Sequence, residues 1–156
     1  MLGEKFKKNY KSIVEKFEKK ESALISLLYE IQKENNYISD GDISELSSLI
    51  DMPYSRIKSV LTFYTMFNQK KTGKYHIQVC RNLSCSMSGA RNIINFIKEN
   101  LKINEHEVSD DGLFSYTTVE CLGACGSSPV VMINDTYYEN MDEKKLRELI
   151  DKLRKE

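Results

Sequence analysis

The four cysteines of the chain fall into two pairs, and they are the residues best suited to chemistry. Cys80 and Cys85 form a C-x4-C motif, and Cys121 and Cys125 form a C-x3-C motif. Small residues surround the second pair, which lets backbone amides approach whatever the sulfur atoms hold. In a reducing cytosol, clustered cysteines are more often metal ligands or redox groups than structural disulfides. The spacing therefore predicts a metal cluster.

Three other interpretations of the cysteines stay open at this point. A structural zinc site also takes two pairs of thiolates, although its ligand loops usually hold two residues between the cysteines. A dithiol redox enzyme favours C-x-x-C, which neither pair has. The third interpretation is a set of unrelated thiols, buried as small hydrophobic groups.

Composition restricts the class of protein that carries these cysteines. A length of 156 residues suffices for one domain or two small ones. Lys and Arg total 23, as do Asp and Glu, so the charge gives no support for a nucleic-acid partner. No apolar run resembles a signal peptide or a membrane span, so we expect a cytoplasmic protein with no direct membrane insertion.

The first half of the chain shows helical periodicity. Apolar residues recur every three or four positions in four segments, which are 6–17, 24–31, 43–50 and 57–64. We expect Asp40 to cap the third helix, and Pro53 suits the first turn of the fourth. The polar segment 69–73 ends in glycine and is the best linker in the chain.

After this linker the periodicity changes to the alternation of a β-strand. Residues 75–80 alternate and predict a strand that delivers Cys80 to a loop. The later segments predict a helix, a second strand that ends at Cys121, a hairpin and a closing helix, at 90–101, 114–120, 130–138 and 146–153. We therefore predict an α+β (α/β-like) fold with a helical domain in 1–73 and a second domain in 74–156.

The order of the predicted elements explains how the two cysteine pairs could meet. If the first two strands run parallel, a crossover connection brings their ends to the same edge of the sheet. Four thiolates then converge. A two-iron cluster requires this number, because each iron takes two bridging sulfides and two protein thiolates.

Several stretches together resemble a known protein family. They are the segment 60–67, the strand 76–80, the two cysteine pairs, and Gly89, Ala90, Pro129 and Asn134. This combination is similar to the thioredoxin-like [2Fe-2S] small subunit of NADH-dehydrogenase complexes. The same family supplies subunits of NAD(P)-linked, often electron-bifurcating, hydrogenases and of NAD-dependent formate dehydrogenases. The resemblance runs from about Leu24 to the last helix.

The resemblance implies an N-terminal helical bundle followed by a thioredoxin-like mixed sheet with flanking helices. By position, Cys80 and Cys85 hold one iron of a single [2Fe-2S] cluster, and Cys121 and Cys125 hold the other. The family role is that of an electron-transfer subunit in an NAD(P)H-dependent, flavin-containing oxidoreductase complex. Such a subunit relays single electrons and performs no substrate chemistry, so we expect no catalytic residue in this chain.

Other cofactors are expected on a partner subunit. The chain has no G-x-G-x-x-G motif after a strand and no P-loop. The resemblance places FMN and NAD(H) on a larger iron-sulfur flavoprotein, which associates in some complexes with a hydrogenase or another catalytic subunit. The alternative function is a zinc-stabilised protein-interaction module without redox activity.

The residues around the cysteines suggest how the sulfur atoms are stabilised. Donors to sulfur are expected from the amides of Gly123, Ala124 and Gly126 and from the hydroxyls of Ser84 and Ser86.

The remaining histidines and aromatic residues suggest no further site. His76 and His106 are expected to be polar surface residues. The aromatic residues Phe63, Tyr64 and Phe67 are expected to form a packed helix face.

Overall fold

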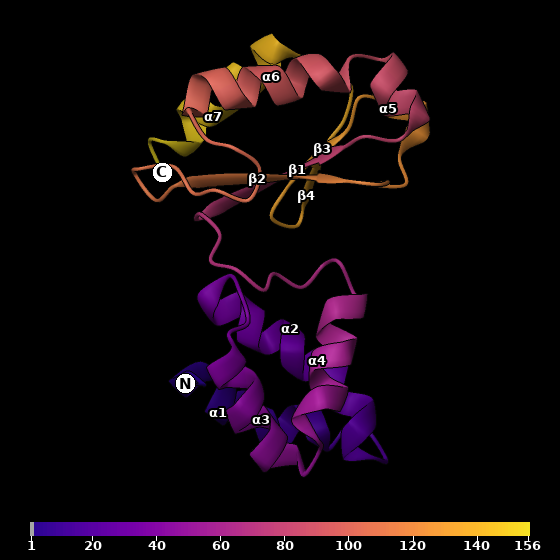
Figure 1. The fold of residues 1–156 in the computed structure, drawn as a ribbon, viewed down its shortest axis with the longest axis vertical. Helices are drawn as coiled ribbons and strands as arrows, with labels where there is room; N and C mark the ends of the chain where they lie inside the picture. Colours follow the sequence, from indigo (N-terminus) through magenta and orange to yellow (C-terminus); the bar gives the residue numbers. More distant parts are fainter. Residues whose placement is uncertain (1) are drawn as a thin grey trace. The chain divides into compact units, whose positions relative to one another are not determined.

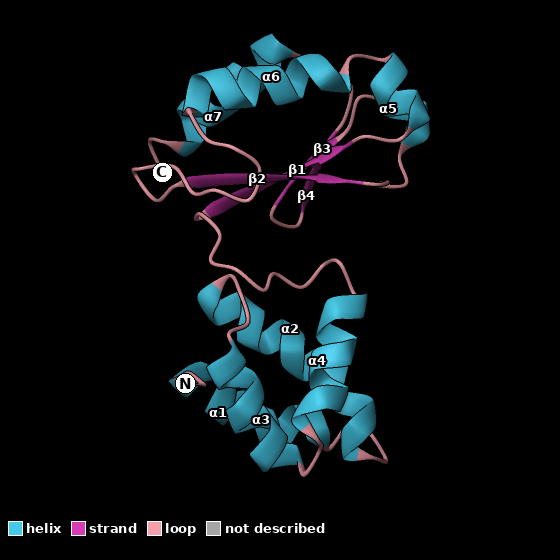
Figure 2. Cartoon of the chain, viewed as in Figure 1, coloured by secondary structure: helices cyan, strands magenta, loops and turns pink. Residues whose placement is uncertain are grey.

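The computed structural model describes residues 2–156 and is drawn in Figures 1 and 2. The chain divides into two compact units, Met1–Lys71 and Thr72–Glu156. Each unit buries a hydrophobic core of its own. Within residues 2–156, no helix is long and apolar enough to cross a membrane.

The N-terminal unit is helical throughout its regular elements. It contains α1 (Glu4–Val14), the 3-10 helix η1 (Lys20–Ala23), α2 (Leu24–Asn35), α3 (Asp40–Ile50) and α4 (Tyr54–Phe63). The apolar stripes of these helices meet in a core whose fully buried members include Phe6, Leu27, Leu28, Ile31, Ile43, Leu46, Ile57 and Leu61. Burying one such side chain contributes about 1.5–3 kcal/mol, so this core stabilises the bundle.

The start of α3 differs from the sequence-based expectation. Ser39, and not Asp40, is the N-cap residue: its hydroxyl accepts a hydrogen bond from the Asp42 amide, and the Asp42 carboxylate accepts one from the Ser39 amide. This reciprocal pair satisfies two backbone donors at once, which a cap at Asp40 does not. The Asp40 carboxylate instead lies 2.8 Å from Lys58 Nζ. Pro53 also stands one position earlier than expected, at the N-cap of α4.

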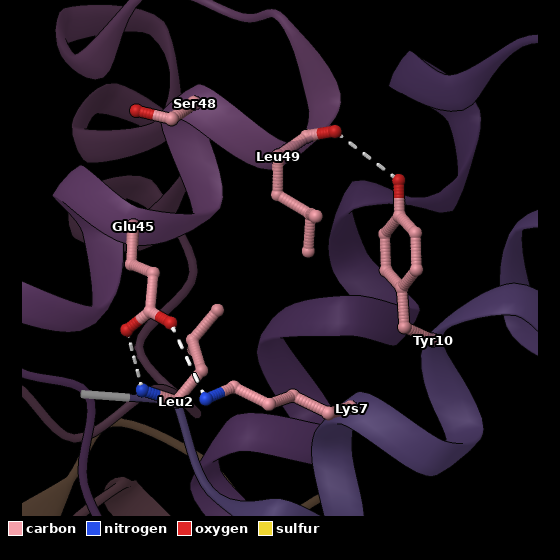
Figure 3. Close-up of a pocket in the computed structure, with 6 residues that line it drawn as sticks. All are labelled: Leu2, Lys7, Tyr10, Glu45, Ser48 and Leu49. Carbon is pink, nitrogen blue, oxygen red and sulfur yellow. Dashed lines mark hydrogen bonds and ion pairs between the residues drawn. The ribbon is translucent and has the colours of Figure 1, made fainter.

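Polar contacts link the N-terminal segment and α1 to α3, as Figure 3 shows. Glu45 accepts a hydrogen bond from the Leu2 amide at 2.7 Å and lies 3.8 Å from Lys7 Nζ. The Tyr10 hydroxyl donates to the Leu49 carbonyl oxygen at 3.3 Å. These residues line a cavity of about 470 Å³ on the surface of the helical unit.

The C-terminal unit consists of a four-stranded sheet and three α-helices. Its elements are β1 (Tyr75–Cys80), α5 (Leu83–Met87), α6 (Ala90–Leu101), β2 (Phe114–Val119), the 3-10 helix η2 (Cys125–Ser127), β3 (Val131–Ile133), β4 (Thr136–Tyr138) and α7 (Glu143–Leu153). The strand order is β2-β1-β3-β4. Strand β1 pairs with β2 in parallel and with β3 antiparallel, and β3 and β4 form the expected hairpin. The predicted α+β fold with a mixed sheet is confirmed.

Alternation along β1 decides which face of the sheet is covered. Tyr75, Ile77 and Val79 belong to the core that includes the apolar faces of α6 and α7. Figure 1 shows both helices on the same side of the sheet. From α6 this core receives Ala90, Ile93, Phe96, Ile97 and Leu101, and from α7 it receives Leu146, Ile150 and Leu153. The apolar side chains that recur along α6 and α7 and alternate along β1 therefore pack into one core.

The side chain of His76 is buried, so the expectation of a surface position was wrong. It retains only 7% of its exposure, so the face of β1 opposite Ile77 is also covered at this position. Ser115 Oγ lies 2.9 Å from His76 Nδ1 and also accepts a hydrogen bond from the Gly73 amide. His106 is exposed, as expected.

The aromatic residues at the end of α4 do not share one environment. Phe67 is buried in the core of the helical unit, whereas Phe63 is largely exposed and Tyr64 is half-buried. Phe63 is the last residue of α4 and Tyr64 is its C-cap. The expectation of one packed helix face was therefore wrong for Phe63, which lies two positions after the buried Leu61 and so on a different face of α4.

Candidate metal centre

The two cysteine pairs leave the sheet from neighbouring parallel strands. Cys80 is the last residue of β1 and lies opposite Val119, the last residue of β2. Cys121 follows two positions after Val119. Because the strands are parallel and in register, the chain leaves both at the same edge of the sheet. The fold thus delivers the two cysteine loops to one place.

The first loop contains a short helix that periodicity did not predict. Helix α5 places Cys85 in its centre, and the Asn82 side chain caps its start by accepting a hydrogen bond from the Leu83 amide at 2.7 Å. The Ser86 hydroxyl, expected to donate to sulfur, instead donates to the Arg81 carbonyl oxygen at 2.8 Å. The asparagine before a small helical turn is the signal that could have revealed α5.

The second loop turns at a glycine and approaches a sulfur atom with its backbone. Gly123 has φ 75°, a left-handed conformation that favours glycine. Its amide donates a hydrogen bond to Cys121 Sγ at 3.3 Å. Gly123 was among the expected sulfur donors. The loop continues into η2, which begins at Cys125, and the Ser128–Pro129 peptide that follows is cis.

The electrostatic surroundings differ within the first pair. Burial raises the pKa of the Cys80 thiol, but the amides of Asn82 and Leu122 and the neighbouring thiols outweigh burial, so this pKa is lowered. The pKa of Cys85 is raised by burial and by its contact with Cys80. Hydrogen bonds to a thiolate favour the charged form that metals bind. The Asn82 and Leu122 amides were not among the donors expected from the sequence. Leu122 belongs to the other cysteine loop, so its approach to Cys80 depends on the fold.

The same interactions connect the four thiols into one group. Cys80 interacts with the side chains of Cys85 and Cys121, and the charge of Cys125 helps raise the pKa of Cys85. All four are free thiols; Cys80 and Cys85 are buried, whereas Cys121 and Cys125 are exposed. Among the described residues, no three His, Cys, Asp or Glu side chains are placed to hold a single metal ion. The structure therefore brings together two pairs of thiols, one inside and one at the surface.

Comparison with known proteins assigns the fold. The family model described as thioredoxin-like [2Fe-2S] ferredoxin matches residues 10–154. The chain belongs to this family. Membership confirms the resemblance seen in the sequence and implies an iron-sulfur cluster.

Two relatives are similar to the chain over most of its length. An NADH-quinone oxidoreductase subunit of Rickettsia bellii is 44% identical over 145 residues, which are 91% of this chain and 87% of the relative. An NADH-quinone oxidoreductase subunit of Thermus thermophilus is 38% identical over 138 residues, 88% of this chain and 76% of the relative.

A solved structure supports the fold independently. An NAD+-reducing [NiFe]-hydrogenase in the air-oxidized state superposes with a TM-score of 0.73 over 84% of this chain, at 20% sequence identity. The match covers 22% of that hydrogenase chain.

The donor set of the thioredoxin-like ferredoxin fits a two-iron cluster. Iron in such clusters takes thiolate ligands, and the site offers four free cysteines in two pairs. Each iron needs only two protein thiolates, so no three donors have to surround one ion. The amides directed at Cys80 and Cys121 supply the hydrogen bonds that thiolate ligands need.

Proposed function

We propose that Cys80, Cys85, Cys121 and Cys125 hold one [2Fe-2S] cluster, the first two on one iron and the last two on the other. The observation that carries this proposal is the exit of both cysteine loops from the same edge of parallel strands β1 and β2. The mutual interactions of the four thiols support it. When bound, the cluster accepts and releases one electron at a time.

The protein residues around the thiols adjust how easily that electron is accepted. Amides of Asn82, Leu122 and Gly123 direct partial positive charge at sulfur, which favours the more negative, reduced form. Burial of Cys80 and Cys85 excludes water from one half of the site, which disfavours additional negative charge. The exposed half, at Cys121 and Cys125, is the side from which an electron partner can approach.

The whole chain is proposed to be an electron-transfer subunit of a larger, cytoplasmic oxidoreductase. The names of the Rickettsia and Thermus relatives, both subunits of NADH-quinone oxidoreductase, support this role. On this proposal, a partner flavoprotein binds NAD(H) and FMN, and the cluster exchanges single electrons with the flavin or with an adjacent iron-sulfur centre. The complex is an NADH dehydrogenase or an NAD(P)-linked hydrogenase. Residues 74–156 act as the ferredoxin domain and residues 1–73 as a helical domain.

Elemental analysis of the anaerobically purified full chain tests the cluster. We expect about two irons and two acid-labile sulfides per chain, with visible absorption that bleaches on adding dithionite. A colourless protein with one zinc per chain contradicts the proposal and favours the zinc-stabilised interaction module.

Serine substitutions test the ligand set one residue at a time. Each of the four Cys→Ser variants is expected to lose or alter the visible and EPR spectra, because a hydroxyl is a poor substitute for a thiolate on iron. Ser86→Ala is the matched control, since its hydroxyl bonds a carbonyl oxygen and not a sulfur atom. An unaltered spectrum in Cys121→Ser removes that residue from the ligand set.

Purification of the tagged chain from its own cells tests the partner. We expect a flavoprotein to be recovered with it, in a complex that contains FMN and oxidises NADH or NADPH. Recovery of a folded, cluster-containing chain without any flavin contradicts the proposed complex while leaving the cluster intact.

A further inference from the structure

An ion pair joins the two residues that adjoin Cys80 and Cys121 in the chain. Arg81 follows Cys80 in the chain, and Glu120 precedes Cys121. Arg81 Nε lies 3.1 Å from Glu120 Oε1, and Arg81 Nη2 contacts the same oxygen. The Arg81 amide also donates to the Val119 carbonyl oxygen at 2.9 Å. The parallel register of β1 and β2 is what places the two charges together.

The backbone of the same residues contacts the site itself. The Cys80 thiol is directed at the Glu120 carbonyl oxygen, with sulfur and oxygen 4.0 Å apart. A full positive charge and a full negative charge are therefore attached to the two residues that adjoin Cys80 and Cys121. Their side chains keep 56% and 78% of their exposure, so the pair contributes little to stability.

We propose that the opposite charges of Arg81 and Glu120 set the reduction potential of the cluster, an inference that rests on the proposed function. Reduction adds one negative charge to a cluster that is already anionic. A nearby guanidinium favours the reduced form, and a nearby carboxylate disfavours it. Joined in one ion pair, the two charges largely cancel. The reduction potential is therefore expected to lie between the values that either charge alone would give.

This cancellation makes the two single substitutions act in opposite directions. Arg81→Gln leaves the Glu120 carboxylate uncompensated, which lowers the potential. Glu120→Gln leaves the Arg81 guanidinium uncompensated, which raises it. The double variant restores near-neutrality and is expected to lie close to the wild type. Arg81→Lys keeps the charge and is expected to shift the potential less than Arg81→Gln does.

Anaerobic redox titration of the full, cluster-containing chain, followed by EPR, measures these shifts. At low ionic strength, each single Gln variant is expected to change the equilibrium constant for reduction by several-fold, up to about tenfold, or about 59 mV for one electron. Since the charges are exposed, 1 M salt, with a Debye length of about 3 Å, is expected to shrink both shifts.

Arg154→Gln is the matched control, because it removes the same charge from the same unit. Its guanidinium lies 5.8 Å from the ring of Phe114, the first residue of β2, at the end of that strand away from Cys121. We expect the reduction potential of the Arg154→Gln variant to equal that of the wild type.

Three outcomes overturn the inference, and they can be told apart. Shifts of the same direction in both single variants indicate a purely structural contact between the loops. Unchanged potentials in variants that keep their iron and sulfide leave the cluster in place but remove any role of the ion pair in setting its potential. A wild-type chain without iron and sulfide overturns this inference together with the proposed function.

Discussion

Acid should destabilise this protein through one buried imidazole. His76 is almost inaccessible to solvent, and its Nε2 atom has no hydrogen-bond partner within residues 2–156. Burial, followed by the charge of His106, lowers the pKa of His76 from 6.5 to about 4. The folded chain therefore holds this side chain neutral at a pH where the unfolded chain protonates it.

The sign and size of the effect follow from this pKa difference. Between pH 6.5 and about 4 the unfolded chain binds more protons at this residue, so the free energy of unfolding falls as the pH falls. The stabilisation is complete above pH 6.5 and lost by about pH 4. One pKa unit corresponds to about 1.4 kcal/mol, so the full effect is about 3 kcal/mol, and about 2 kcal/mol is lost between about pH 7 and about pH 4.5.

Two measurements test this prediction on the full chain. Proton NMR of the imidazole should show His76 titrating near pH 4 in the folded protein. Urea unfolding of the wild type, His76→Gln and His106→Gln at neutral and acid pH gives the slope of the free energy of unfolding against pH, which should be shallowest in His76→Gln. His106→Gln removes the only other histidine of the chain and the charge that adds to the effect of burial, so it should reduce the slope much less. Loss of the cluster in acid affects all three proteins alike and cancels in the comparison. A native His76 that titrates near its ordinary pKa refutes the reasoning.

Three substitutions test the packing by thermal and urea denaturation. Tyr116→Phe is expected to raise the free energy of unfolding by about 1 kcal/mol, since its buried hydroxyl has no partner within residues 2–156; a clear loss contradicts this. Gly73→Ala is expected to lower the free energy of unfolding by about 1–3 kcal/mol, because a Cβ there comes within 2.6 Å of a backbone carbon of β2. Gly126→Ala is the control and should lower it far less, because a Cβ at Gly126 meets open space. Ile97→Ala should cost about 2–5 kcal/mol as a fully buried residue, and an equal cost for the largely exposed Leu83→Ala would argue against this core.

Secondary structure was predictable from sequence where an element is long enough for its apolar residues to show a period. Strand β1 and helix α6 have the predicted bounds, because each buries one alternating or helical face against the same core. Helix α5 was missed because five residues are too few for a helical period to appear. His76 was misplaced because alternation identifies two faces of a strand but not whether the second face is covered.

The sequence nominates the four thiols of the candidate site but says little of their surroundings. Cysteine spacing and the neighbouring segments predict the thiols as ligands, because ligand type and number are sequence properties, and this assignment stays a prediction. The amide of Leu122 near Cys80, and the ion pair of Arg81 with Glu120, depend on the register of β1 against β2. Register arises from the packing of the whole sheet, so no local pattern reports it.

The unequal burial of the two cysteine pairs has a consequence for how the site is filled and emptied. On the proposed ligand set, Cys80 and Cys85 are buried, whereas Cys121 and Cys125 are the ligands that solvent reaches in the folded chain. The loop between them has space, since nothing lies within 4 Å of a side-chain position at Gly123. On the same proposal, assembly of the cluster and attack by oxygen or chelators are both expected from the side of Cys121 and Cys125. A partner subunit bound over this loop is then expected to slow the loss of the cluster.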